Sequence, residues 1–475
     1  MTMRRTFTVF LAVCILLIFG FVSVHVIFIG VADDVQVTRE TLYGDPSAVD
    51  GARILARNMY HRNLLWETSM IHDEELEVST EFTFSNENII IPKEPAWAGI
   101  EIGWMRDLFF FNSSRLPESS RIKYEKLLSA MDKMIESIPN GGQKSFGLDF
   151  GKYLDYYPLD GQVILPQLST VFSEFEHWFS DSEAISKAIN DFFRIPITGA
   201  FSVDYRLDKK DNHTSGYASM NVDYQFHASG VATENACYFT FDATMEDGSV
   251  VDTSLIPGGY GIYCLPYEGS VLKLDQLKMV YSLDPTEGYE SMALAGDGKY
   301  LLLHTWNDDD LMLTVIDIAT MTQIQRVNIH TRSSDVRLDV ICYDDFILMV
   351  ENSSVSDELD RLTVWEECPD HSWKHSFTVR WDLSMIPDGD HLDLFNTDTN
   401  AVDFKDGKLV LVTNKIEEYR SYRYQNYCDF YVLVFEESGM TYAGSYHLNL
   451  TDVNSQEPGS RRVRNTTDLP LEVSW

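Results

Sequence analysis

Residues 297 to 329 consist of three apolar runs separated by two short polar breaks, and this pattern constrains the fold more than any other feature of the sequence. The runs are 300–306, 311–318 and 323–329, and the breaks are 307–310 and 319–322. Runs that are apolar almost throughout are typical of strands covered on both faces. The third run alternates polar and apolar residues, as an outer strand with one solvated face does. The stretch therefore predicts an antiparallel meander in which Asp308 to Asp310 form a hairpin turn.

The same pattern returns further along the chain. A second copy lies at 345–350, 361–365 and 376–379, a third at 406–413, 429–435 and 442–448, and a partial earlier copy at 259–265 and 277–283. Recurring units of three or four strands are typical of β-propeller blades, which bury their faces only against neighbouring blades. The predicted fold class is mainly β, with β-propeller-like meander blades. A β-sandwich built from the same meanders is the alternative.

The chain before residue 260 is less regular. Strand patterns occur at 76–84 and 88–92, whereas 119–138 and 168–193 carry apolar residues at helical spacing. These two segments predict a helical insertion within β structure. The predicted domains are a cytoplasmic tail at 1–6, a transmembrane anchor at 7–31, an N-terminal β region at 33–117, the helical insertion at 118–195 and the β-propeller-like blades at 196–475.

An uninterrupted apolar run from Phe7 to Val31 contains no Asp, Glu, Lys or Arg. At a rise of about 1.5 Å per residue, a helix of this length crosses a hydrocarbon core of about 30 Å. The run is longer than the apolar core of a cleaved signal peptide, which favours a retained signal-anchor. Arg4 and Arg5 precede the run and Asp33 follows it, so the positive-inside rule predicts a single-pass protein of the cell membrane with an extracytoplasmic C-terminal domain.

The charge balance narrows the choice of partners. The formal net charge is −36, from 73 acidic and 37 basic residues, and such a surface repels nucleic acid phosphates. We therefore expect no nucleic acid partner. The 44% of hydrophobic residues and 13% of aromatic residues indicate a globular chain.

Five of the six cysteines lie beyond the apolar run, and none forms a CxxC pair, which disfavours a zinc ribbon or a thioredoxin-like site. Because five is odd, at least one thiol is unpaired within the chain. Bridges between Cys237 and Cys264 and between Cys342 and Cys368 are one interpretation. Isolated buried thiols are the other.

Motifs for catalysis are missing from the sequence. It holds neither HExxH nor GxSxG, and in the segment 140–145, which resembles the end of a P-loop, Gln143 replaces the required glycine. An ordinary turn after a helix is favoured there. Trp373 and Trp381 fit either sugar stacking or the core, and the core is favoured. The sequence thus assigns no catalytic residue.

An acidic stretch from Asp388 to Asn400 is the one pattern typical of metal binding. It places oxygen ligands at alternate positions, as calcium loops do. Ala401 and Gly407, however, stand where an EF-hand loop requires Gly and Glu. A solvated loop is favoured, so no cofactor-binding or metal residue is assigned and calcium is the only cofactor considered.

Blade-like repeats over residues 260 to 450, behind one anchoring helix, resemble uncharacterised single-pass extracytoplasmic proteins of Gram-positive bacteria with a β-propeller-like ectodomain. The resemblance rests on the strand pattern and carries no functional residue. The expected function is a membrane-anchored extracytoplasmic binding or sensing protein whose partner is an unknown ligand, an envelope protein or an envelope polymer. The alternatives are a carboxylate-dependent hydrolase of glycans or lactones and a structural subunit of a membrane complex.

Overall fold

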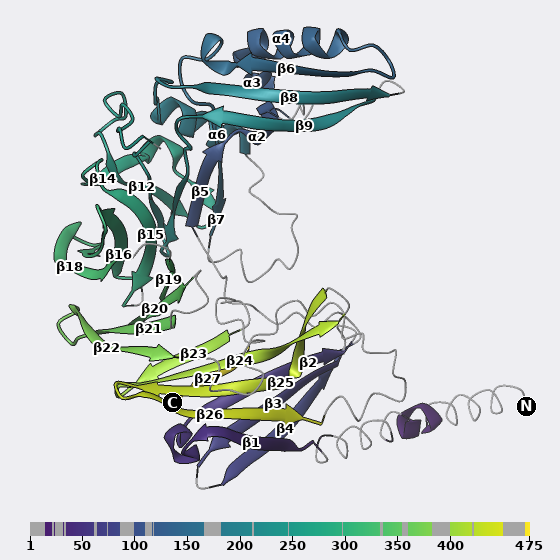
Figure 1. Ribbon diagram of the computed structural model, residues 1–475, viewed down its shortest axis with the longest axis vertical. Helices are drawn as coiled ribbons and strands as arrows, with labels where there is room; N and C mark the ends of the chain where they lie inside the picture. The colour runs from purple at the N-terminus through teal and green to yellow at the C-terminus, as the bar shows by residue number, and fades with distance from the viewer. Residues whose placement is uncertain are drawn as a thin grey trace, which may run out of the picture.

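A computed structural model describes residues 15–20, 23, 32, 35–60, 64–73, 75–85, 99–109, 116, 118–165, 182–210, 213–245, 247–296, 298–332, 336–353, 360–381, 400–419, 422–449 and 471–475. Within these residues the chain is mainly β, with a few short helices, as the sequence predicts (Figure 1).

Six sheets account for the named strands, and they are numbered here for reference. Sheet 1 is β27 (Glu472–Ser474), β2 (Arg53–Tyr60), β3 (Leu64–His72) and β4 (Leu76–Phe84). Sheet 2 is β13 (Val271–Leu272), β12 (Gly261–Glu268), β11 (Ala236–Phe241), β10 (Ala228–Ala232), β5 (Gly99–Trp104) and β7 (Leu159–Ile164), with β14 (Lys278–Ser282) also paired to β12.

The next three sheets follow one another in sequence. Sheet 3 is β15 (Gly288–Ala295), β16 (Tyr300–Asn307), β17 (Asp310–Asp317) and β18 (Thr322–Thr331). Sheet 4 is β19 (Val336–Cys342), β20 (Phe346–Ser353), β21 (Asp360–Glu367) and β22 (Trp373–Trp381). Sheet 5 is β1 (Val37–Gly44), β26 (Gly439–Leu448), β25 (Tyr422–Glu436), β24 (Lys408–Tyr419) and β23 (Asn400–Lys405). Sheet 6 is β6 (Gln143–Asp149), β8 (Phe201–Lys210) and β9 (His213–Val222).

The three predicted meander copies are confirmed. They correspond to β16–β18, β20–β22 and β24–β26, each an antiparallel series, and the partial earlier copy corresponds to the pair β12 and β14. The sequence missed one further strand at the start of each meander, namely β15, β19 and β23. The hairpin turn at Asp308 is also confirmed, because Asn307 pairs with Asp310 across it.

The continuous apolar runs are explained by burial on both faces of a sheet. In β16, Leu301 and Leu303 pack against sheet 2, whereas Leu302 between them packs against sheet 4. All three side chains are at most 1% exposed. Alternate residues of one strand thus serve two different interfaces, which removes the polar alternation of a half-solvated strand.

Apolar clusters join the sheets face to face in the order 1, 5, 4, 3 and 2. Figure 1 shows the sheets following one another along an arc, with sheet 6 and α4 (Glu125–Glu136) at the end away from sheet 1. The far face of sheet 2 is covered by helices and by sheet 6. No apolar cluster of the described residues joins sheet 1 to sheet 2, and this succession differs from the two sheets of a sandwich.

The sequence did not predict the strands β1 and β27, which lie near the two ends of the described chain. β1 pairs with β26 in sheet 5, and β27 pairs with β2 in sheet 1. An ion pair between Arg57 and Glu472 and a hydrogen bond of 2.7 Å from the Trp475 backbone N–H to Asp403 Oδ2 hold the C-terminal strand in place.

The helices confirm part of the predicted insertion. The segment 119–138 forms α3 (Glu118–Lys123) and α4, and the end of the segment 168–193 forms α6 (Ser182–Phe192), while 166–181 lies outside the described residues. The strands β6 and β7 also lie within 118–195. The remaining helices are α2 (Arg106–Phe109) and three short 3-10 helices, η1 (Pro46–Val49), η2 (Phe150–Lys152) and η3 (Leu274–Gln276).

No helix among the described residues has the length and apolar character needed to span a membrane. The predicted tail at 1–6 and most of the predicted anchor at 7–31 lie outside the described residues.

Candidate functional site

The two edges of the stacked sheets are distinguished by the strand ends that lie there. One edge, called here the hairpin edge, carries the short connections 343–345, 368–372 and 406–407. At the other edge β15 begins and β16, β18 and β20 end, and polar side chains from sheets 3 and 4 meet there. We call it the charged edge and define it by Glu287, Glu290, Trp306, Arg326, His330, Arg332, Glu351 and Arg361.

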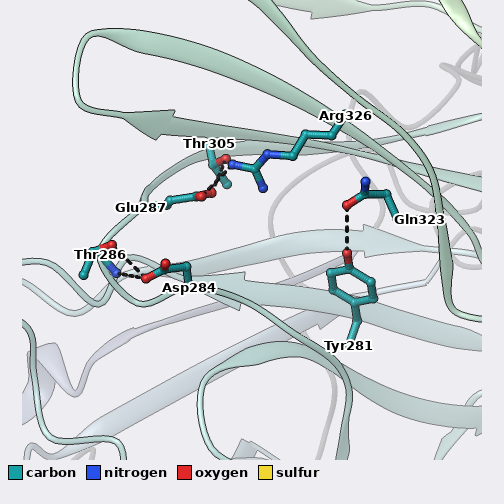
Figure 2. A network of polar contacts seen from close by, with 7 residues as sticks. All are labelled: Tyr281, Asp284, Thr286, Glu287, Thr305, Gln323 and Arg326. Atoms are coloured by element: carbon teal, nitrogen blue, oxygen red, sulfur yellow. Dashed lines mark hydrogen bonds and ion pairs between the residues drawn. The ribbon is translucent and has the colours of Figure 1, made fainter.

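A polar network at this edge ties the connection between β14 and β15 to sheet 3 (Figure 2). Glu287 accepts a hydrogen bond of 3.0 Å from the Thr305 hydroxyl and one of 2.5 Å from Arg326 Nη2. In the same connection, Asp284 Oδ1 accepts from the backbone N–H and the hydroxyl of Thr286, and these bonds lower the pKa of Asp284. The network holds a carboxylate and a guanidinium in fixed positions on two strands and a loop.

Trp306, near the end of β16, is held from two sides. Its indole Nε1–H donates a hydrogen bond of 2.6 Å to Glu290 Oε2. The Arg332 guanidinium lies over the indole ring, with Cζ 4.1 Å from the ring centroid. A guanidinium over an aromatic face at this distance is a cation–π contact.

A buried carboxylate links sheets 3 and 4. The side chain of Glu351, 9% exposed, lies 3.5 Å from His330 Nδ1 and 3.8 Å from Arg361 Nη1. Burial lowers the pKa of His330, and Arg361 and Arg332 lower it further against the opposing effect of Glu351. His330 is therefore neutral at neutral pH, and Arg361 supplies the positive charge opposite Glu351.

The arrangement suits binding better than bond cleavage. Glu287, Glu290 and Glu351 each contact a side chain that neutralises or orients them, so they form a fixed pattern of charges and donors. No group of three or more His, Cys, Asp or Glu that could hold a metal ion occurs within the residues that the structure describes.

The hairpin edge carries a different feature. The pKa of Asp345 is raised, first by burial and then by the nearby carboxylates of Asp403, Asp344 and Glu367. Glu367 is in turn 2.8 Å from His371 Nδ1. A carboxyl group whose pKa is raised by burial and by neighbouring carboxylates is a feature of general acids.

Several residues singled out by the sequence have structural roles. Trp373 is 2% exposed and belongs to the core between sheets 3 and 4, as predicted. Residues 139–142 form a turn, and Lys144 lies in β6, where it donates to the Ser137 hydroxyl at 2.9 Å. The calcium-loop pattern at 388–399 and the side chain of Trp381 lie outside the described residues.

The cysteine question is settled for four residues: Cys237, Cys264, Cys342 and Cys368 are free thiols. Cys264 pairs with Tyr238, the neighbour of Cys237, on the adjacent strand. Because side chains alternate along a strand, Cys237 and Cys264 point to opposite faces of sheet 2 and cannot form a bridge. Burial raises the pKa of both Cys237 and Cys342 to about 12.

The charged edge was not foreseen from the sequence. Its residues are single polar positions at the ends of apolar strands. A usable signal was present in β20, where Glu351 follows Ile347 and Met349 at the same alternate spacing and so shares their buried face. Contact between residues of separate sheets, such as His330 with Glu351, leaves no local pattern.

The comparisons with known proteins do not assign this chain to a family. No protein-family model matches the chain, and no curated protein matches it. Among solved structures, a candidate 6-phosphogluconolactonase from Bacteroides fragilis is 8% identical, with a TM-score of 0.29, covering 84% of this chain and 95% of that one. TolB from Acinetobacter baumannii is 10% identical, with a TM-score of 0.23, covering 84% of this chain and 80% of that one.

A β-propeller domain of Cps50 (Swd1) from Myceliophteria thermophila is 10% identical, with a TM-score of 0.21, covering 52% of this chain and 82% of that one. These TM-scores are too low to establish a shared fold, and no argument rests on them.

Proposed function

We propose that the chain is an extracytoplasmic binding protein, anchored in the membrane by residues 7–31, whose propeller-like sheets present the charged edge to an envelope polymer or partner protein. The observation that supports this proposal is the meeting of paired charged side chains from sheets 3 and 4 at one edge. Groups fixed on strand ends form a more rigid binding surface than groups on loops.

The propeller-like architecture is part of the proposal. Each meander sheet packs its two faces on its neighbours, as blades do. The resemblance to single-pass extracytoplasmic proteins of Gram-positive bacteria is also part of the proposal. It places an anchored binding domain where it faces the cell envelope.

Binding is tested by cosedimentation of the full chain, in mild detergent, with insoluble envelope polymer. The double variant Glu351→Gln, Arg361→Gln removes both charges of the buried pair and should weaken binding at least about tenfold, or about 1.4 kcal/mol. The matched control is Glu366→Gln, Lys374→Gln, which removes an ion pair of 2.8 Å toward the hairpin edge. Equal loss of binding in both variants would count against a site at the charged edge.

Anchoring is tested separately from binding. The full chain should stay in the membrane fraction after an alkaline carbonate wash, and a chain that lacks residues 2–32 should become soluble. In intact cells the C-terminal domain should be open to added protease. Release of the full chain by carbonate would contradict the anchor.

The hydrolase alternative is favoured by one observation, the raised pKa of Asp345 among three other carboxylates. A panel of glycosides and lactones, tested with the full chain, separates it from pure binding. If the chain is a hydrolase of this kind, Asp345→Asn should lower turnover about 100-fold or more. Asp370→Asn, a change at an exposed carboxylate of the same edge, is the control.

A further inference from the structure

Among the residues that the structure describes, Arg332 is a cation without a carboxylate partner, on a strongly acidic chain. Within the described residues no carboxylate oxygen lies within ion-pair distance of its guanidinium, although the chain as a whole carries a net charge of −36. Its own backbone N–H donates to the Asp309 carbonyl at 2.7 Å, and the nearby Asp310 carboxylate accepts from the Thr331 hydroxyl, also at 2.7 Å. The carboxylate of Asp310 is thus already engaged elsewhere.

The Trp306 ring fixes the orientation of Arg332. The guanidinium Cζ lies over the indole ring, 4.1 Å from its centroid, and a planar guanidinium carries five N–H donors around its edge. The indole is itself held by Glu290, so the platform is rigid. Arg332 is exposed to solvent.

Arg361 supplies a second, partly used guanidinium. Its contact with Glu351 is long, 3.8 Å through Nη1 alone, which leaves other N–H donors unused by that pair. Both Arg332 and Arg361 act on the same imidazole, since each lowers the pKa of His330. The edge-on contact of the Trp306 and His330 rings, with centroids 6.4 Å apart, links the two halves of the cluster.

We infer that Arg332 and Arg361, supported by Trp306 and Glu351, form a subsite for an oxyanion, the carboxylate or phosphate group of an anionic ligand. Arginine donors fit the paired oxygens of both groups, and they bind them better than they bind a neutral sugar hydroxyl. The subsite deepens the proposed binding function, on which it rests, by naming an acidic polymer or a ligand with an acidic group as the class of molecule bound.

The test is calorimetric titration of the full chain with sodium phosphate, sodium glucuronate and uncharged glucose at constant ionic strength. The two anions distinguish a phosphate source from a carboxylate source, and binding of either one supports the subsite. Arg332→Gln should weaken binding of the preferred anion at least about tenfold, as expected for the loss of a charge-assisted pair. Arg332→Lys keeps the charge but not the planar fork and should fall between the two.

Arg206→Gln is the matched control. Arg206 is an exposed arginine beside an aromatic ring, with Nη1 3.3 Å from the Tyr217 hydroxyl, but it lies in sheet 6. Its removal should leave anion binding unchanged, and thermal unfolding of every variant verifies that the fold is intact. Anion binding that is absent from the wild-type chain, or equal in Arg332→Gln and wild type, would overturn the subsite.

The subsite and the proposed function fail in different ways. If the Glu351 and Arg361 variant loses envelope polymer while no small oxyanion binds, the subsite is wrong and the binding function stands. If phosphate or glucuronate binds through Arg332 while no envelope polymer or partner is retained, the subsite stands and the proposed function is wrong.

Discussion

Two histidines, His72 and His304, are enclosed in the sheet interfaces with too few hydrogen-bond partners. His72 is 1% exposed and lies against the Tyr446 ring, and neither of its ring nitrogens has a hydrogen-bond partner among the described residues. His304 has a contact of 3.0 Å from Nδ1 to the Ser291 hydroxyl, whereas its Nε2 has no partner in the same part of the chain. Burial lowers the pKa of each histidine to about 4. Both side chains are therefore neutral in the folded protein under ordinary conditions.

This burial predicts acid sensitivity with a definite sign. The folded pKa of about 4 lies below the usual 6.5, so the unfolded chain binds more protons between these values. Stability is fully present above pH 6.5 and is lost as the pH falls toward 4, by up to about 3 kcal/mol for each histidine. Urea unfolding at pH 7 and pH 4.5 should show a smaller loss for His72→Phe than for wild type. Equal losses would contradict the enclosed, neutral state of His72.

The position of a single residue can be predicted from the sequence where its own chemistry determines that position. Trp373 is predicted in the core because aromatic residues of β-rich proteins usually lie there, and Asp308 is predicted in a turn from the polar run around it; both predictions are confirmed. Glu351 was not foreseen, because His330 comes from another sheet and Arg361 pairs with it across β20 and β21. A sequence pattern predicts on which face of a strand a side chain lies. It does not predict which residues of another sheet pack against that face.

Strands covered on both faces are the elements on which the fold depends most. Leu313 in β17 is fully buried in the interface of sheets 3 and 4, so Leu313→Ala should lower the free energy of unfolding by about 2–5 kcal/mol. Ile324→Ala in the neighbouring β18, where the side chain is 41% exposed, should cost less than about 1 kcal/mol. Chemical denaturation of both variants measures the difference. Similar losses would show that β17 is not enclosed between two sheets.

The strands that the sequence missed share a physical cause. β15, β19 and β23 mix polar and apolar residues, and β15 keeps most of its side chains partly exposed. β15 and β23 lack both the continuous apolar run and a regular alternation, whereas β19 alternates from Val336 to Val340, a signal that the sequence prediction did not use. β1 and β27 were missed for another reason, because pairing between the two ends of a chain has no local signature.

At the scale of the whole molecule, the C-terminal strand β27 completes sheet 1. Deleting residues 471–475 removes β27 and the ion-pair partner of Arg57, Glu472. It also exposes the apolar cluster between sheets 1 and 5, to which Leu471, 5% exposed, belongs. We expect a loss of about 3 kcal/mol or more in the free energy of unfolding. Glu472→Gln removes only a charge that is 54% exposed and should cost less than about 1 kcal/mol. A deletion as mild as this substitution would show that β27 does not close the sheet.

The central claim is that the charged edge, and not the hairpin edge, is where the molecule binds its partner. Hydrogen–deuterium exchange of the full chain, with and without envelope polymer, tests it most directly. Bound polymer should slow exchange at the ends of β16, β18 and β20 and the start of β21, and leave the connections 343–345 and 368–372 unchanged. Slower exchange confined to the hairpin edge, where Asp345 lies, would contradict the claim and favour the hydrolase.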